Sequence, residues 1–277
     1  MPRDAAGRLA ARVHRAARRT GARRALLLDL DGTLAPIAPT PESARVPRAT
    51  LQALRDLVAQ GWTIAIVSGR PSSQVRGLIP VRAVRVFGSH GLEGSWTVGR
   101  ATTLSPSIRK RLALLARDGA RLAATTPGAR VERKPAGVAF HDRKVRPTRL
   151  RRWRDRLRAW LEEQNLEGLE TLRGRRVLEL RPTGVHKGNV ATRLLERSPT
   201  PEHADESLVA IGDDRTDEDL FKAIGKRGLT IRVGRAGVGT AARERLPSPI
   251  SVERFLTFLA EADEPATGAQ SAARALS

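Results

Sequence analysis

The chain has 277 residues, of which 40% are hydrophobic and 29% charged, so it can bury a core and its composition excludes a disordered chain. It has no cysteine, which excludes disulfides, thiolate nucleophiles and zinc–thiolate sites and predicts a cytoplasmic location. No apolar run reaches the roughly 20 residues that cross a bilayer, so we expect no membrane partner. Fifty Lys and Arg against 29 Asp and Glu give a net charge of +21, which by itself favours nucleic acid, an anionic surface or an acidic ligand.

The first part of the chain alternates between predicted strands and helices. Residues 1–24 form a basic N-terminal extension in which Leu9, Val13 and Ala17 have helical spacing, so we predict an amphipathic helix there. The elements that follow are strand 25–30, helix 47–60, strand 63–68, a helix from residue 71 and strand 83–91. This alternation is typical of a doubly wound, mostly parallel α/β sheet.

The pattern changes after Gly94 and later returns to the first type. The middle elements are helix 106–122, strands 129–134 and 137–143, helix 147–164, and strands 169–173 and 176–182. The late elements are a helix after residue 188, strand 207–214, a helix from residue 217, strand 229–234 and helix 252–259. We therefore predict a core made of residues 25–94 and 183–260, an inserted α-ββ-α-ββ domain at 95–182, and a loose tail at 261–277.

Acidic residues follow two of the strands in the predicted core. Asp29 and Asp31 come after the first strand, and Asp213 and Asp214 after the late strand. Ligands of open parallel sheets bind outside the carboxyl ends of the strands. Four carboxylates gathered there would repel one another, and Mg²⁺ suits a site made of a few carboxylates and a phosphate. The sequence therefore predicts a magnesium site at this edge.

Four motifs occur in a characteristic order, namely D-L-D-G-T-L from Asp29, S-G-R from Ser68, Lys187 at the start of a helix, and G-D-D-R-T-D-E from Gly212. With these motifs the chain resembles the haloacid-dehalogenase-like (HAD) phosphatase superfamily over about residues 25–259. The resemblance implies that Asp29 is a nucleophile that forms an aspartyl-phosphate and that Asp31 is the general acid and then the base.

The same resemblance implies roles for the remaining motif residues. Ser68 would donate a hydrogen bond to the phosphoryl oxygens, and Lys187 would steady the nucleophile and the intermediate. The implied metal ligands are Asp29, the main-chain carbonyl of Asp31, Asp213 and, in the same cluster, Asp214. Further residues expected at the phosphate are Gly32, Thr33, Gly69 and Arg70.

Several segments of the core and of the inserted domain resemble the trehalose-6-phosphate phosphatase family in particular. These segments are GSHG (88–91), VERKPAGVAFHDR (131–143), LELRPTGVHKG (178–188) and GDDRTDEDLF (212–221). The residues expected to bind sugar hydroxyls are His90, Glu132, Lys134, His141, Arg143 and Glu179. Strand alternation predicts that Glu132 and Lys134 share one face, as do His141 and Arg143.

Some observations on the inserted domain leave alternatives open. The charged residues of the hairpin could instead form cross-strand ion pairs. Arg181 is expected to meet a surface carboxylate, and Asp142 stands where the resemblance implies an aromatic residue.

The predicted function is Mg²⁺-dependent hydrolysis of trehalose 6-phosphate, the last step of trehalose biosynthesis, by a monomer coupled functionally to a separate trehalose-phosphate synthase. One alternative is a phosphatase for sucrose 6-phosphate, mannosylglycerate phosphate or a hexose phosphate, and a phosphomutase is another. A catalytically silent nucleic-acid-binding protein is a distant alternative, because the arginines are scattered and an aromatic content of 3% argues against a stacking platform.

Overall fold

The computed structural model describes residues 4–19, 24–94, 104–174, 176–196, 205–235, 237 and 239–262. The chain forms two compact units. Unit 1 comprises Met1–Val67, Val75–Val86 and Gly188–Ser277, and unit 2 comprises Ser68–Gln74 and Phe87–Lys187. The second unit is thus built from segments inserted within the first, and it includes the loops that follow β2 and β3 as well as residues 95–182.

A seven-stranded sheet has the order β11-β10-β9-β1-β2-β3-β4. Its strands are β1 (Ala25–Leu28), β2 (Thr63–Val67), β3 (Arg85–Gly88), β4 (Glu93–Gly94), β9 (Leu208–Gly212), β10 (Leu229–Val233) and β11 (Glu244–Leu246). The strands from β11 to β2 are parallel, whereas β4 runs antiparallel to β3. The last three residues of the central strand β1 are leucines that are at most 2% exposed, as expected for a strand covered on both faces.

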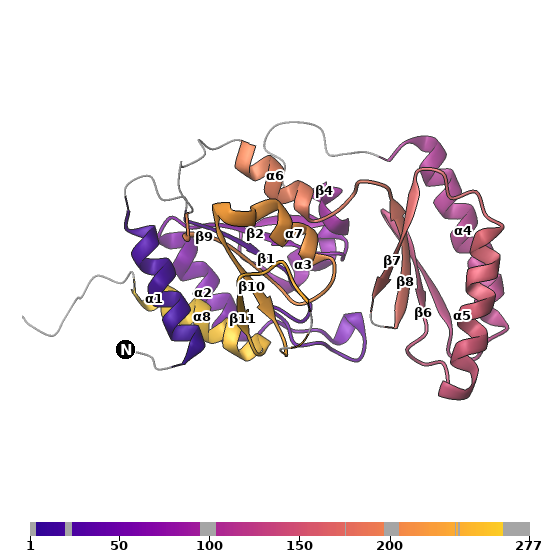
Figure 1. Cartoon of the computed structure of the whole chain (residues 1–277), viewed down its shortest axis with the longest axis horizontal. Coiled ribbons are helices and arrows are strands. Elements are labelled where there is room, and N and C mark those ends of the chain that lie inside the picture. The colour runs from indigo at the N-terminus through magenta and orange to yellow at the C-terminus, as the bar shows by residue number, and fades with distance from the viewer. Residues whose placement is uncertain are drawn as a thin grey trace, which may run out of the picture. The chain divides into compact units, whose positions relative to one another are not determined.

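Helices cover the parallel sheet. They are α1 (Ala5–Ala17), α2 (Arg48–Ala59), α3 (Ser72–Leu78), α6 (Gly188–Glu196), α7 (Asp217–Ile224) and α8 (Pro249–Ala262), with short 3₁₀ turns η1 (Pro41–Ser43), η2 (Ser89–Gly91) and η3 (Gly225–Arg227). Figure 1 shows α1, α2 and α8 grouped together, apart from α6 and α7. No helix in the described part of the chain is long and apolar enough to cross a membrane.

The N-terminal helix α1 belongs to the core of unit 1. The apolar residues Leu9 and Val13, whose spacing predicted this helix, are buried in the same cluster as the apolar face of α8. On its other side, Arg12 Nε donates to Glu206 Oε2 and Arg12 Nη1 donates to Glu244 Oε1, both at 2.7 Å. The hydrogen bond to Glu206 is the main reason why the pKa of Arg12 is raised. A basic helix is therefore anchored by apolar burial and by two carboxylates.

Unit 2 contains the antiparallel layer that the sequence predicts. Its strands β5 (Arg130–Lys134), β6 (Gly137–His141), β7 (Leu169–Gly174) and β8 (Val177–Pro182) have the order β5-β6-β8-β7, and its helices are α4 (Pro106–Ala124) and α5 (Pro147–Glu162). Figure 1 shows both helices against one face of this sheet. Phe140 and Trp153, each 1% exposed, lie in the apolar core of this unit. The α-ββ-α-ββ order is confirmed.

Candidate active site

Three aspartates converge at the carboxyl edge of the parallel sheet in unit 1. Asp29 follows β1 and Asp213 follows β9, and the parallel register pairs Leu28 with Ile211, so the two strands end at the same level. Asp29 N donates to Ile211 O at 2.9 Å. Asp217, the first residue of α7, completes the group, and one carboxylate oxygen from each aspartate lies within 4.8 Å of the others.

The loop between β9 and α7 is folded around the side chain of Asp217. This residue is fully buried, and its Oδ2 accepts hydrogen bonds from Asp213 N and Asp214 N, both at 3.0 Å. Gly212 leaves the space that this requires, because a Cβ at Gly212 would lie 2.2 Å from Asp217 Cγ. Asp217 therefore holds the backbone that presents Asp213.

The turn after β1 brings its backbone against Asp213. Leu30 O accepts from Ala35 N at 2.8 Å, and Gly32 N donates to Ala35 O at 2.7 Å. Gly32 has φ +87°, and a Cβ there would lie 2.2 Å from Asp213 Oδ2. Thr33 in the same turn is buried, and its Oγ1 has no hydrogen-bond partner among the described residues.

The two other predicted acidic residues have different surroundings. Asp31 is half-buried in the turn after β1 and forms an isolated bridge with Ala35. Asp214 is exposed and is not part of the group formed by Asp29, Asp213 and Asp217. Its Oδ1 accepts from Thr216 N at 2.7 Å and from Thr216 Oγ1 at 2.6 Å, which closes the turn before α7.

The donor chemistry of the three aspartates fits a hard divalent cation. They offer only carboxylate oxygens, the ligand type that such cations prefer. Asp29 and Asp217 are buried, and carboxylates at this spacing would repel one another strongly without a compensating positive charge. The group is therefore compatible with a bound metal ion.

Unit 2 holds the predicted residues of the loops after β2 and β3. Ser68 N donates to Phe87 O and His90 N donates to Ser68 O, both at 2.9 Å. Ser68 Oγ accepts from Arg70 N at 3.2 Å. Gly69 lies against the imidazole, because a Cβ there would be 2.8 Å from His90 Cε1. The two loops therefore place Ser68, Gly69, Arg70 and His90 together.

Four of the expected sugar-binding residues lie on one face of the antiparallel sheet. Glu132 and Glu179 both lie opposite Ala139 in the register, so they share a face. His141 Nε2 lies 2.8 Å from Glu132 Oε2, and Lys134 Nζ donates to Glu179 Oε2 at 2.9 Å. The cross-strand ion pairs considered as the alternative are thus present, and they hold four polar side chains in place on this face.

His90 also contacts this group, with Nε2 3.4 Å from Glu179 Oε1. The geometry is not that of a hydrogen bond, and neither ring nitrogen of His90 has a hydrogen-bond partner in the described part of the chain. Burial lowers the pKa of His90 more than the Glu179 carboxylate raises it. Burial alone would raise the pKa of Glu179, but His90 and Lys134 together lower it to about 2. Lys187, at 2% exposure, adds a charge that also lowers the pKa of His90.

Arg143 lies outside the strand, so the prediction that it shares a strand face with His141 was wrong. Strand β6 ends at His141, and Arg143 is exposed in the turn that follows. Asp142 explains the early end, because its buried carboxylate is paired with Arg154 Nε at 2.7 Å and Arg176 Nε at 2.9 Å. At the position where an aromatic residue was expected, Asp142 therefore makes structural ion pairs.

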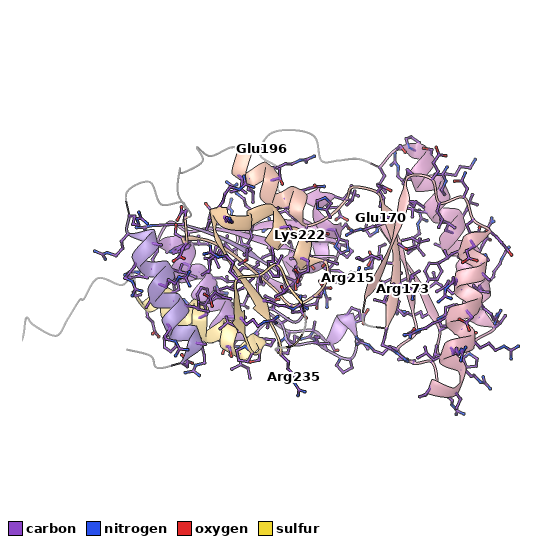
Figure 2. The ribbon with its side chains drawn as sticks, in the orientation of Figure 1. Glu170, Arg173, Glu196, Arg215, Lys222 and Arg235 are labelled. Carbon is purple, nitrogen blue, oxygen red and sulfur yellow. The ribbon has the colours of Figure 1, made fainter. Side chains whose placement is uncertain are left out.

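Arg181 on β8 meets a carboxylate, as the sequence predicts. Its Nε donates to Oε1 of Glu170 on β7 at 2.7 Å, and Figure 2 labels Glu170 on this strand. Arg181 is 6% exposed and the side chain of Glu170 is 37% exposed, so this pair lies at the edge of the buried part of unit 2.

Comparison with known proteins identifies the family. The sequence model described as trehalose-phosphatase matches residues 27–246, which include the three aspartates and the whole antiparallel sheet. The chain belongs to the trehalose-phosphatase family. It is therefore a phosphatase, and residues 1–26, with α1, lie outside the matched range.

Individual relatives agree with this assignment. The rice (Oryza sativa subsp. japonica) protein named "Probable trehalose-phosphate phosphatase 4" is 34% identical over 257 residues, which cover 89% of this chain and 68% of that protein. A solved structure of the C. albicans trehalose-6-phosphate phosphatase C-terminal domain has a TM-score of 0.76 at 24% identity, over 94% of this chain and 98% of that one. A HAD-superfamily phosphatase from Bacteroides thetaiotaomicron has a TM-score of 0.58 at 18% identity, over 86% and 94% of the two chains. The two structures show that the fold is HAD-like.

Sequence reasoning did not include Asp217 in the acidic group of this phosphatase. Asp217 belongs to the T-D-E segment that follows the predicted metal loop, four residues after Asp213. Side chains at the start of a helix lean towards its N-terminus, so the first residue of α7 turns back towards the end of β9. The sequence did contain a signal for this role of Asp217: an acidic residue begins a helix shortly after a strand that ends in acidic residues.

Proposed function

We propose that this phosphatase hydrolyses trehalose 6-phosphate to trehalose and inorganic phosphate, with Mg²⁺ and with Asp29 as the nucleophile. The observation that carries the proposal is the buried carboxylate of Asp29, which meets Asp213 and Asp217 at the end of β1 in a chain of this family. The names of the relatives support trehalose 6-phosphate as the substrate, and the resemblance of the motifs supports the catalytic roles.

In the first step, an Asp29 carboxylate oxygen bonds to phosphorus while the bond between phosphorus and the sugar oxygen breaks. Asp31 donates its proton to that oxygen, so trehalose leaves as a neutral alcohol. In the second step, the Asp31 carboxylate takes a proton from water, whose oxygen bonds to phosphorus as the bond to Asp29 breaks.

Asp29, Asp213 and Asp217, with the main-chain carbonyl of Asp31, are the residues that would hold Mg²⁺. When bound, this ion neutralises charge on the transferring phosphoryl group. Asp214 shapes the same loop through Thr216 and remains a candidate for indirect support of the metal.

The other predicted residues receive binding roles in this proposal. Ser68 donates to the phosphoryl oxygens, and Lys187 contributes a fixed positive charge. Backbone groups of the loops after β1 and β2 also bind phosphate, at Gly32, Thr33, Gly69 and Arg70. Donors and acceptors for sugar hydroxyls are supplied by His90, Glu132, Lys134, His141, Arg143 and Glu179.

We further propose that the enzyme is a cytoplasmic monomer that takes its substrate from a separate trehalose-phosphate synthase. Residues 25–94 and 183–260 would form the catalytic core, and residues 95–182 would form the domain that selects the sugar. A mass measurement in solution checks the monomer, independently of activity.

The test is phosphate release from trehalose 6-phosphate, sucrose 6-phosphate, glucose 6-phosphate and a mannosylglycerate phosphate, each with Mg²⁺ and with a chelator. We expect release from trehalose 6-phosphate that exceeds the others by at least about 100-fold in kcat/KM, since a missing set of hydroxyl contacts leaves buried polar groups unpaired. Preference for another ester would retain the Asp29 chemistry and contradict the substrate. Absence of release from all four esters by the folded protein would contradict the proposed function.

A further inference from the structure

The carboxylate of Glu93 connects the two loops that carry Ser68, Arg70 and His90. Glu93 is the first residue of β4, and its Oε2 accepts from Ser72 N at 3.0 Å and from Ser72 Oγ at 2.8 Å. Its Oε1 accepts from Ser89 Oγ at 2.5 Å. One side chain therefore bonds to the first residue of α3, directly after the loop that follows β2, and to the loop after β3 at the same time.

Backbone hydrogen bonds join the same loops at the level of the proposed binding residues. Ser89 N donates to Arg70 O at 2.8 Å, and His90 N donates to Ser68 O at 2.9 Å. Gly88 allows the close approach, because a Cβ there would lie 2.3 Å from Ser72 N. The loops are therefore aligned by two backbone bonds, and the Glu93 carboxylate closes this arrangement at one end.

The loop after β3 needs such support because its backbone is strained. Ser89 has φ +50° and His90 has φ +58°, in the left-handed region that residues with a Cβ adopt at an energetic cost. Gly91 continues the run with φ +94°. A conformation of this kind persists only when surrounding contacts determine it, and the bond from Ser89 Oγ to Glu93 is one of those contacts.

We propose that Glu93 is a positioning residue for the phosphatase reaction, which holds the Ser68–Arg70 loop and the Ser89–Gly91 loop in register through Ser72 and Ser89. This inference rests on the proposed function, because it concerns how Ser68 is aligned for the phosphoryl group. Glu93 itself touches neither the substrate nor the three aspartates in this role. It acts through residues that it bonds to.

Two substitutions of Glu93 separate the effect of its hydrogen bonds from the effect of its charge. Glu93→Ala removes all three bonds. In Glu93→Gln the amide oxygen can accept both bonds from Ser72. The amide nitrogen can donate to Ser89 Oγ, which then accepts the hydrogen bond that it donates in wild type. Ser89→Ala removes only one bond and serves if Glu93→Ala does not fold. The matched control is Glu162→Ala, an exposed glutamate on α5 in the same unit.

The first readout is steady-state kinetics on trehalose 6-phosphate well below the unfolding temperature. We expect Glu93→Ala to lower kcat by about 10- to 100-fold, since a misplacement of about 1 Å can cost 100-fold, with KM changed less than kcat. Glu93→Gln should stay within about threefold of wild type, as should Glu162→Ala. When Ser68 is already replaced by alanine, Glu93→Ala should lower kcat by a clearly smaller factor than it does in wild type, because the effects of residues that act through one another are not additive.

The second readout does not depend on activity. Amide hydrogen exchange at Ser89 and His90 should become faster in Glu93→Ala, whereas exchange at Leu27 in β1 should not change. Any of three results would overturn the inference. The first is a kcat of Glu93→Ala within twofold of wild type, and the second is an equal fold-loss of kcat with Ser68 and with Ser68→Ala. The third is unchanged amide exchange at Ser89 and His90. If the wild type released no phosphate, the proposed function would fail, and the exchange data alone would decide whether Glu93 holds the loops.

Discussion

Replacement of Asp217 tests whether this residue both shapes the loop after β9 and contributes to the metal site. Its Oδ2 is the acceptor for the backbone N–H groups of Asp213 and Asp214. Asp217→Ala leaves both donors without this partner, at a cost of about 1–3 kcal/mol for each donor that water cannot reach. Asp214 is exposed and Asp213 is half-buried, so water compensates in part and we expect a total loss of about 2–4 kcal/mol.

Asp217→Asn separates the two functions. The amide oxygen of asparagine can still accept both backbone bonds, so we expect a loss of stability of only about 1 kcal/mol or less. The variant has no carboxylate at this position of the acidic group, so the Mg²⁺ concentration for half-maximal activity should rise by about 10- to 100-fold. Phosphate release at saturating Mg²⁺ should recover a large part of the wild-type rate.

The assay combines thermal unfolding with Mg²⁺ titration of phosphate release, and Asp219→Asn on the same helix is the matched control. For a domain of this size, 2–4 kcal/mol corresponds to a fall in the unfolding midpoint of about 5–15 °C for Asp217→Ala. Unchanged Mg²⁺ dependence in Asp217→Asn would refute its place in the metal site. An unchanged unfolding midpoint in Asp217→Ala would refute its structural role.

Three further substitutions test other parts of the structure. Gly32→Ala should lower the unfolding free energy by about 1–2 kcal/mol, because residue 32 has a left-handed backbone. It should also weaken Mg²⁺ activation, because the new Cβ collides with Asp213. A Mg²⁺ titration like that of wild type would contradict this. Glu179, whose pKa falls from 4.5 to about 2, should contribute about 3 kcal/mol above pH 4.5, and this contribution should disappear as the pH falls through 2. The difference in unfolding free energy between wild type and Glu179→Gln should therefore shrink between pH 6 and pH 2, and a constant difference would contradict the assignment. Arg12→Ala should lower the unfolding free energy by about 1 kcal/mol and leave kcat unchanged. The loss should be smaller at high salt, because the ion pairs of Arg12 with Glu206 and Glu244 are partly exposed. An equal loss at low and high salt would argue against ion pairing.

The strands that carry the catalytic residues could be predicted because each is a short apolar run followed directly by its functional group. Asp29 after β1 and Asp213 after β9 follow this pattern, and parallel strand ends necessarily share an edge. Strands β4 and β11 were not predicted, since two and three residues are too few to show a period.

The rest of the site depends on contacts between distant parts of the chain, which local pattern does not contain. The end of β6 at His141 follows from ion pairs of Asp142 with residues 12 and 34 positions away. Likewise, the helical spacing of Leu9 and Val13 predicts α1 but not its burial beside α8, more than 230 residues later. Sequence pattern therefore locates elements and strand-end groups, while register breaks and docking partners come from the tertiary structure.

The most direct test of the catalytic proposal compares wild type with Asp29→Asn in phosphate release from trehalose 6-phosphate at saturating Mg²⁺. Asparagine keeps the size of the side chain and the fold around β1, but its neutral amide is a much weaker nucleophile than the carboxylate. We expect wild type to release phosphate and Asp29→Asn to lose at least about 1,000-fold in kcat, as is usual when a covalent nucleophile is removed. A folded Asp29→Asn variant with more than a tenth of the wild-type kcat would contradict the aspartyl-phosphate mechanism.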